Sequence, residues 1–519
     1  MENLSKYSLR GIKKIAFILL LTLVLAPMTA FAGASKPEAV KLTAEQAVAR
    51  ALRHNLSLEV ERLQAALSDA PERAANAAFA PTLFGDASIS SSPGQVSASR
   101  AGVAPVSNLS VGGGIGMRKT FSTGTSVDVS LSSTALIATQ GTLSSQNGVD
   151  KLYQSSAKLS ASQSLLNGIS KSANEIGITE ARMQRDAAKR ALARKAEQVS
   201  AQVLAAYFDL DAALRKDAAQ ALAVKTAERA YDDTKKLVAA GKSAPPDLLT
   251  VELSLAQQRR QRVTTTQAIS DARDKLSRLI GLSAPGALTT PEIITSGETP
   301  SLPGAVAIDA MLSSAFERRG DYQAAVEQID LNKKKLSAAK HKLLPKLDLV
   351  GSVFVTGIGA DGGDAGAAGS NISQGYASSF EMNRVGWSAG LVFSMPLGND
   401  AAKAQTKLAD LALSRATTQA ALVKQQIAQE LLVARRAVQA AKSQLELREL
   451  AAKVAERKLS DHRALYAAGK IAAALLASVQ AEAASEALGA AEARAALSKA
   501  VVSLHSAAGS LLSGMKLSI

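Results

Sequence analysis

The sequence has little of what most enzymes and nucleic-acid-binding proteins depend on. None of its 519 residues is cysteine, which excludes disulfides, thiol catalysis and metal sites with cysteine ligands. Aromatic residues make up 3% of the chain, too few for the stacking platforms that bind single-stranded nucleic acids. We therefore assign the net charge of +15 to solvated helix faces, where basic and acidic residues are interspersed, and expect no nucleic-acid partner.

Side chains for metal binding and catalysis are also scarce. The chain has four histidines, and no two of them are spaced i, i+4 as metal ligands on one helix face would be. Gly241-Lys242-Ser243 resembles part of a phosphate-binding loop, but it lacks the earlier glycine and the preceding strand. We expect no enzyme activity, no catalytic residue, no cofactor and no metal.

Long hydrophobic runs are missing after the N-terminus. The one apolar run, residues 15–25, follows basic residues and precedes the small-residue site Ala30-Phe31-Ala32. It has about half of the ~20 residues that a membrane-spanning helix needs. Residues 1–32 are therefore predicted to be a secretory signal peptide.

The sequence does contain a long duplication. Residues 427–466 carry a heptad seam with spacing four and three, which predicts a long helix packed against other helices in coiled-coil fashion. The seam recurs 228 residues earlier, at 199–238, with polar exceptions that include Thr234. Both copies then end in Ala-Ala-Gly-Lys, at Gly241 and Gly469. Such a repeat indicates a duplicated supersecondary unit.

Each unit is predicted to be a helix, a β-hairpin, a long helix and a short helix. The first repeat is expected at 33–281, with strands within 82–166, a long helix at 170–240 and a helical tip at 241–247. A linker rich in proline and glycine follows at 282–307. The second repeat is expected at 308–511, with strands within 347–395, a long helix at 399–466, a tip at 469–475, and then a C-terminal tail at 512–519.

The predicted strands have one apolar and one polar face. Val127, Val129 and Leu131 alternate with polar residues. This pattern is typical of transmembrane β-barrel strands and equally of a soluble β-sandwich. The first repeat also has room for an additional hairpin near 109–133, turning at Thr123-Gly124. This hairpin could project beyond the barrel or add strands to it, and we favour projection.

Helix lengths predict the architecture. A helix of about 70 residues is roughly 100 Å long, and the two shorter helices of each unit together match it. They can therefore stack end to end beside it, which places both tips at one pole and both hairpins at the other. Because open sheet edges are not tolerated in lipid, several protomers must contribute strands to one barrel.

Three paired stretches resemble one known family. These are 81–83 and 345–347, which contain Pro81 and Pro345; the strand exits 163–168 and 394–399, the second with Pro396; and the tips 240–242 and 466–470. In this duplicated order they resemble the TolC-like outer membrane efflux proteins.

The resemblance implies an α+β fold in which a homotrimer forms a long α-helical barrel and a 12-stranded transmembrane β-barrel. It implies residence in the outer membrane of a Gram-negative bacterium, in contact with its lipid, with the helices in the periplasm. The implied function is a passive exit duct of a tripartite efflux or type I secretion system. Its implied partners are a periplasmic adaptor protein and an inner-membrane pump.

The resemblance also implies a gate at the helical tip. The contact between a first-repeat acid and a second-repeat tyrosine falls on Asp247 and Tyr466. The basic partner of the family falls on Ile471, and the acidic constriction ring falls on Leu475 and Ser478, so neither is kept.

Lysines lie beside both tip glycines instead. Lys242 and Lys470 admit two interpretations: a mouth that favours anions, or ordinary cations at helix C-termini, where the helix dipole favours them. The second interpretation needs no pore.

Two other functions fit parts of the sequence. A secreted trimeric coiled-coil adhesin without a pore would explain the signal and the heptads, but not two matched hairpins at one pole. A periplasmic adaptor would have one helical hairpin and a compact β-domain rather than a duplicated rod.

Overall fold

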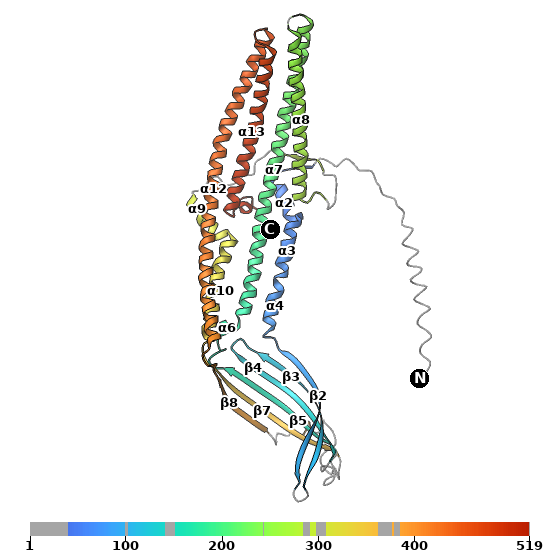
Figure 1. The fold of residues 1–519 in the computed structure, drawn as a ribbon, viewed down its shortest axis with the longest axis vertical. Coiled ribbons are helices and arrows are strands. Elements are labelled where there is room, and N and C mark those ends of the chain that lie inside the picture. Colours follow the sequence, from blue (N-terminus) through green and yellow to red (C-terminus); the bar gives the residue numbers. More distant parts are fainter. Residues whose placement is uncertain are drawn as a thin grey trace, which may run out of the picture.

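The computed structural model of the chain is a long rod, helical over most of its length, with a sheet at one end (Figure 1). It describes residues 40–98, 102–140, 151–241, 243–283, 291–296, 308–361, 376–377 and 385–517. The predicted signal peptide lies outside the described residues. Segregated helices and sheet confirm the predicted α+β class.

Two long helices run the length of the helical part. They are α7 (Ile176–Ala239), of 64 residues, and α12 (Asp400–Ala467), of 68. The return helices α8 (Pro245–Leu279) and α13 (Ala473–Ala507) have 35 residues each, slightly more than half as many. Figure 1 shows α8 beside the half of α7 that is far from the sheet, and α13 in the same position along α12.

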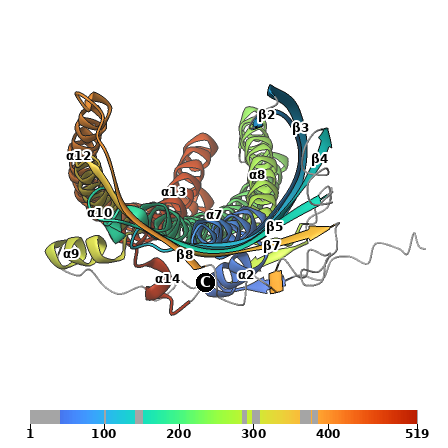
Figure 2. The same ribbon diagram turned by 90° about the horizontal axis from the view of Figure 1, so that it is seen from below.

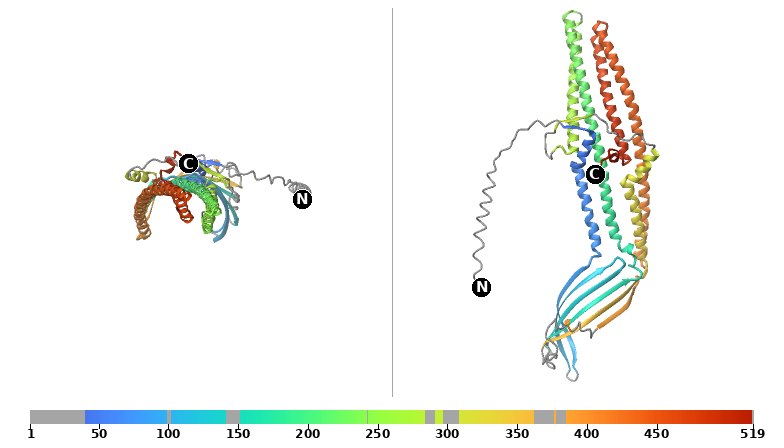
Figure 3. Two further views of the ribbon diagram at one scale, coloured as in Figure 1. Left: turned by 90° about the horizontal axis from the view of Figure 1, so that it is seen from above. Right: turned by 180° about the vertical axis from the view of Figure 1, so that it is seen from behind.

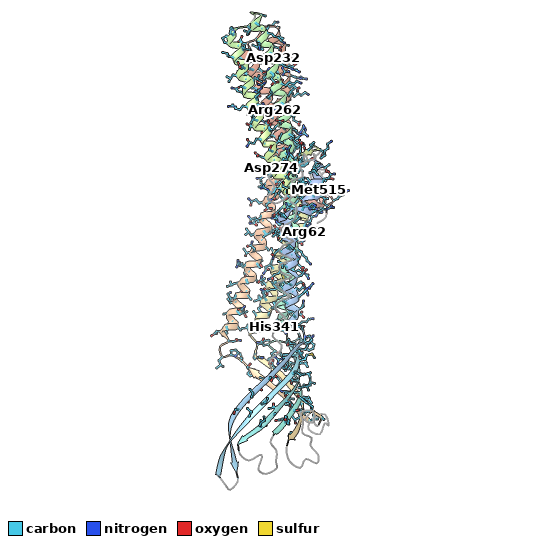
Figure 4. All side chains as sticks on the ribbon, turned by 90° about the vertical axis from the view of Figure 1, so that its right-hand side faces the viewer. Arg62, Asp232, Arg262, Asp274, His341 and Met515 are labelled. Atoms are coloured by element: carbon cyan, nitrogen blue, oxygen red, sulfur yellow. The ribbon has the colours of Figure 1, made fainter. Side chains whose placement is uncertain are left out.

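The other half of each long helix is covered by the helices that lead into the sheet, here called the approach helices. They are α2 (Ala44–His54), α3 (Leu56–Leu67) and α4 (Asp69–Ala77) in the first repeat, and α9 (Ile308–Arg318) and α10 (Gly320–His341) in the second. In Figure 4, His341 lies just above the sheet and Asp232 lies near the tip. Each long helix thus has shorter partners stacked end to end, as its length predicts.

One residue at the same place in each repeat breaks the approach helices. Asn55 ends α2 and caps α3; Arg319, 264 residues later, separates α9 from α10. The Asn55 Nδ2 donates to the carbonyl oxygen of Leu279 at 2.8 Å. The Arg319 Nη1 donates to the carbonyl oxygen of Ala507 at 3.3 Å. Leu279 and Ala507 end the two return helices, so equivalent hydrogen bonds join approach helix to return helix at mid-height.

The largest hydrophobic core lies at this mid-height level, on the convex side of the rod (Figure 2). A parallel pair, β1 (Val40–Leu42) and β6 (Ile293–Thr295), packs there with α2 against α7. The fully buried Tyr207 of α7 donates its hydroxyl to the carbonyl oxygen of Leu42 at 3.2 Å. The predicted linker at 282–307 therefore contains a strand of the core.

Residues 511–517, which include most of the predicted C-terminal tail at 512–519, also pack at this level. A short helix, α14 (Leu511–Gly514), buries Leu512, and the buried Met515 lies on the mid-height bulge in Figure 4. Glu197 of α7 accepts the N–H of Leu512 at 3.3 Å, while its Oε2 is buried without a hydrogen-bond partner among the described residues. Burial raises the pKa of Glu197.

All described strands at the end of the rod form one antiparallel sheet in the order β2-β3-β4-β5-β7-β8. The strands are β2 (Thr82–Ala98), β3 (Gly102–Thr120), β4 (Thr125–Gln140), β5 (Lys151–Ser164), β7 (Lys346–Asp361) and β8 (Val385–Ser394). The first repeat contributes four of these strands, so the additional hairpin predicted near 109–133 is present. The additional hairpin does not project, because β3 and β4 lie inside the sheet between β2 and β5.

The turn between β3 and β4 is fixed to the start of the long-helix segment. Gly124 has φ +79°, and a Cβ there would lie 2.3 Å from the carbonyl oxygen of Gly168, so only glycine fits. Its own carbonyl accepts the N–H of Ser164 at 3.2 Å. Asn174, in the short helix α6 (Lys171–Asn174), donates to the carbonyl oxygens of Ser122 and Gly168 at 2.8 and 2.7 Å.

Arg319→Met tests the mid-height junction. Arg319 is 4% exposed and also donates to Asp321 at 2.6 Å and to Glu430. Its loss leaves Glu430 without this cation and Asp321 with Arg194 alone, 3.5 Å away, so we expect the free energy of unfolding to fall by about 2–4 kcal/mol. Lys333→Met, which removes an exposed pair with Asp330, should change it by less than about 0.5 kcal/mol. Equal effects in denaturant melts would contradict the assignment.

Glu197→Gln tests the buried carboxylate. Because the folded-state pKa is raised, ionisation of Glu197 destabilises the fold above that pKa, and this cost disappears as the pH falls below the ordinary value of 4.5. We expect the variant to melt about 1–2 °C higher at pH 7 than the unmodified protein. The difference should vanish near pH 4; a difference independent of pH would exclude the carboxylate as its cause.

Candidate functional site

One row of directly paired residues crosses all six strands on the apolar face of the sheet. It runs Leu83, Met117, Val129, Leu159, Val353 and Trp387. Every side chain in the row is exposed, from 44% at Val129 to 82% at Leu83. A contiguous exposed apolar surface of this extent marks contact with lipid or with another protein. The apolar face predicted from Val129 and Leu131 thus extends over all six strands of the sheet.

The adjacent row, shifted by one residue, is polar on every strand. It runs Thr82, Arg118, Asp128, Ser160, Ser352 and Ser388. The Arg118 Nε donates to Asp128 at 2.5 Å, and the hydroxyls of Ser352 and Ser388 are 2.8 Å apart. Since side chains alternate between faces, the sheet separates an apolar surface from a polar one.

The lateral edges of the helical layer also carry exposed apolar side chains. Figures 2 and 3 show the rod in cross-section as an open arc with α12 at one end and α8 at the other, and Figure 1 shows α3 below α8 on the same edge. The exposed stripe on α12 includes Leu447, Leu450 and Val454, and that on α3 is Leu56, Val60, Leu63 and Leu67. Heptad-spaced stripes of this kind need a partner helix.

Two side-chain hydrogen bonds join the repeats near the helical tip: Arg463 donates to the hydroxyl of Thr226 at 2.9 Å, and a second bond lies closer to the turns. Gly241 and Gly469, with φ +66° and +68°, turn each long helix into its return helix. Three to seven residues before these turns, the Oγ1 of Thr234 and the hydroxyl of Tyr466 are 2.6 Å apart. Thr234 is fully buried and Tyr466 is half-buried, so a partly buried contact links α7 to α12.

The polar exceptions in the heptad seam make the same cross-helix contact in both repeats. Gln220 donates to the side-chain oxygen of Gln258 at 2.9 Å. Arg448, its equivalent 228 residues later, donates to Glu486 at 3.1 Å, and Glu486 is the equivalent of Gln258. These residues therefore fix the register between each long helix and its return helix. Thr234 was visible in the sequence as such an exception, but its partner Tyr466 was not predictable from it.

The acid predicted for the tip contact is placed differently. Asp247 accepts the hydroxyl of Ser243 at 2.6 Å and the N–H of Ala244 at 3.3 Å, so it caps the start of α8. In the described residues it makes no hydrogen bond with Tyr466. The structure thus brings Tyr466 to Thr234 and leaves Asp247 on its own helix.

The other residues predicted for the tip lie on α13 or just before it. Lys470 is exposed, Leu475 is 46% exposed, and Ser478 donates its hydroxyl to the carbonyl oxygen of Leu475 at 2.8 Å. Lys242 lies outside the described residues. The predicted transition prolines lie at the junction of helices and sheet, directly before β2 and β7 and after β8: Pro81, Pro345 and Pro396.

The described residues offer no metal site, because no three His, Cys, Asp or Glu side chains are grouped to hold an ion. No described helix combines the length and the hydropathy that crossing a membrane requires.

Comparisons with known proteins agree with this geometry. Residues 311–510 match the family described as Outer membrane efflux protein. The fold is similar to that of CusC, at TM-score 0.61 and 15% identity, over 92% of this chain and 95% of that one. It is also similar to the CmeC outer membrane channel of Campylobacter jejuni, at 0.59 and 13%, over 90% and 86%. The open MtrE outer membrane channel of Neisseria gonorrhoeae gives 0.58 and 17%, over 90% and 89%. No curated relative matches the sequence.

Tyr466→Phe and Thr234→Val test the tip contact. Each removes one partner of a hydrogen bond worth about 1 kcal/mol, so each should speed amide exchange around the tip roughly fivefold. The double variant should exchange no faster than either single one, because the second change has nothing left to remove. Additive effects would mean that the two side chains act independently.

Proposed function

We propose that the chain forms the passive exit duct of a tripartite efflux or type I secretion system, because residues 311–510 match the Outer membrane efflux protein family and the fold is similar to that of CusC. The observation that carries the proposal is the six-stranded sheet, apolar on one face and polar on the other, at one pole of a 100 Å helical rod.

Ring closure by three copies is supported by the two edges of the arc. Exposed apolar side chains line both edges at the same level: Leu447, Leu450 and Val454 in the tip half of α12, and Leu249, Leu253 and Val263 of α8 at the other edge, all exposed in the described part of the chain. The sheet likewise ends in two unpaired strands, β2 and β8. Contact between unlike edges repeats around an axis until the ring closes, which buries the stripes and pairs the strands at once.

The two faces of the sheet support an outer-membrane location for the proposed duct. In a closed barrel the apolar row that contains Val129 and Trp387 faces lipid, and the polar row faces the lumen. In this arrangement the helices leave the barrel on the periplasmic side of the membrane and form a tunnel in the periplasm. The seam residues of α7 and α12 stabilise this tunnel by heptad packing.

The tip is the end that meets the partners of the duct. We propose that the turns at Gly241 and Gly469 dock to a periplasmic adaptor that connects to an inner-membrane pump. The Thr234–Tyr466 contact ties the α12–α13 pair to the α7–α8 pair there, which makes it the candidate element of a gate. Asp247 supports the gate through the start of α8 rather than through Tyr466.

Purified protein inserted in a planar bilayer should give discrete ion conductance steps. Tyr466→Phe should raise the time spent in high-conductance states, because it removes the hydrogen bond between the helix pairs that lies nearest the turns. Asp247→Ala should have a smaller effect, since it loosens only the first turn of α8. Bilayers without steps would count against the duct, and unchanged gating in Tyr466→Phe would remove this contact from any gate.

Protease treatment of intact cells distinguishes the duct from a secreted trimeric adhesin. A duct keeps its helices in the periplasm, so α7 and α12 should survive protease outside the cell and be cut only after the outer membrane is permeabilised. Cleavage of these helices on intact cells would favour the adhesin.

A further inference from the structure

We infer that the barrel of this protein has 18 strands rather than 12 and that its bore admits bulky hydrophilic cargo. The inference rests on the proposed function, since it needs three copies around one lumen. It starts from the position of β3 and β4, the two strands by which this sheet exceeds four per chain.

The strands β3 and β4 carry the same two faces as the rest of the sheet. Met117 and Val129, one from each strand, complete the apolar row between Leu83 on one side and Leu159 on the other. Arg118 and Asp128 complete the polar row in the same way. A hairpin that stood in water would have no reason to expose apolar residues in line with lipid-facing ones. The pattern therefore places β3 and β4 in the barrel wall.

The circumference of the helical ring accommodates the larger strand number at an ordinary strand tilt. Four helices per chain at any level give twelve in a trimer, and at 9–10 Å between axes they need a circumference of roughly 110–120 Å. Eighteen strands about 4.8 Å apart and tilted by about 40° enclose roughly 110 Å. Twelve strands at that tilt enclose only about 75 Å. Six strands per chain thus match the sheet to the helices above it, and Figure 2 shows the sheet following the arc of the helices.

The polar face offers little to narrow the bore. Its hydroxyl pairs are small, as between Ser126 and Ser162 or Ser132 and Ser156, both at 2.8 Å. The ring of Phe84 lies where a Cβ of Gly116 would be, at 2.4 Å, so it covers the neighbouring strand instead of filling the lumen.

Charges on this face are largely balanced within the wall. Arg118 pairs with Asp128 at 2.5 Å, and Lys346 pairs with Asp348 at 3.2 Å. The lining therefore selects little by charge. The bore is ~25 Å wide once the side chains are allowed for. The cargo class that fits such a bore is large and polar, such as an extended polypeptide.

Tryptophan fluorescence tests whether β4 lies in the wall. The chain has one tryptophan, Trp387 on β8, so each position can be read alone. In a Trp387→Phe background, Val129→Trp should be quenched by brominated lipid in reconstituted vesicles, to the extent of Trp387 in the unmodified protein. The matched variant Ser130→Trp, on the opposite face, should be quenched by aqueous iodide and not by lipid.

The outcomes separate this inference from the proposed function. If Trp387 is quenched by lipid but Val129→Trp is not, the hairpin lies outside the wall and the 18-stranded barrel is wrong, while the duct stands. If Trp387 is not quenched either, the sheet is not in the membrane and the proposed function itself fails.

Bore size and copy number complete the test. Native mass spectrometry of the detergent-extracted protein should give three copies; any other number overturns the strand count. Polyethylene glycols added only on the barrel side should lower the conductance up to a polymer diameter of ~25 Å. A cut-off near ~15 Å, the bore expected of twelve strands, would overturn the inference.

Discussion

The rod depends on a junction where two helices meet end to end beside a third that does not break. A helix of 64 or 68 residues needs packing partners along its whole length, because most helical stability comes from tertiary packing. Here each long helix packs against an approach helix below and a return helix above, and the ends of these meet at mid-height. The carbonyl groups that end a return helix lack intrahelical partners. Asn55 and Arg319 satisfy one of them in each repeat and also break the approach helix.

The two repeats keep the geometry of these contacts while changing their chemistry. The first repeat uses neutral side chains, Asn55 at the junction and Gln220 on the seam. The second uses cations at the same places, Arg319 and Arg448, each with a carboxylate partner. A buried guanidinium needs its carboxylates, because an unpaired buried charge is costly. The second repeat therefore depends more on intact ion pairs than the first.

The features predicted from the sequence are those that depend on spacing. The heptad seam, the equality of helix lengths, the positions of the turns and the two-faced strands all follow from period and rise per residue, which the chain carries locally. The hydrogen bond between Thr234 and Tyr466 could not be predicted, because Tyr466 comes from the other repeat, 232 residues away. The pair β1 and β6 and the helix α14 were missed for a related reason. Each is short, and its stability comes from the common core around Tyr207 rather than from its own pattern.

The place of the additional hairpin was predicted wrongly, and the strand register explains why the sheet accepts it. An inserted segment must add an even number of strands, or the chain would leave the sheet at the pole far from α7. The residues of the apolar row have odd numbers, so the inserted strands must pair odd-numbered residues with odd-numbered ones. Any other register would turn their apolar side chains into the lumen. The turn at Gly124 meets both conditions: β4 runs away from the helices, β5 returns to them, and Met117 opposes Val129. Alternation alone does not reveal whether the hairpin lies in the sheet, because a projecting hairpin would show the same period of two. The deciding facts are which residues face each other across the strands and how Gly124 fits beneath Gly168.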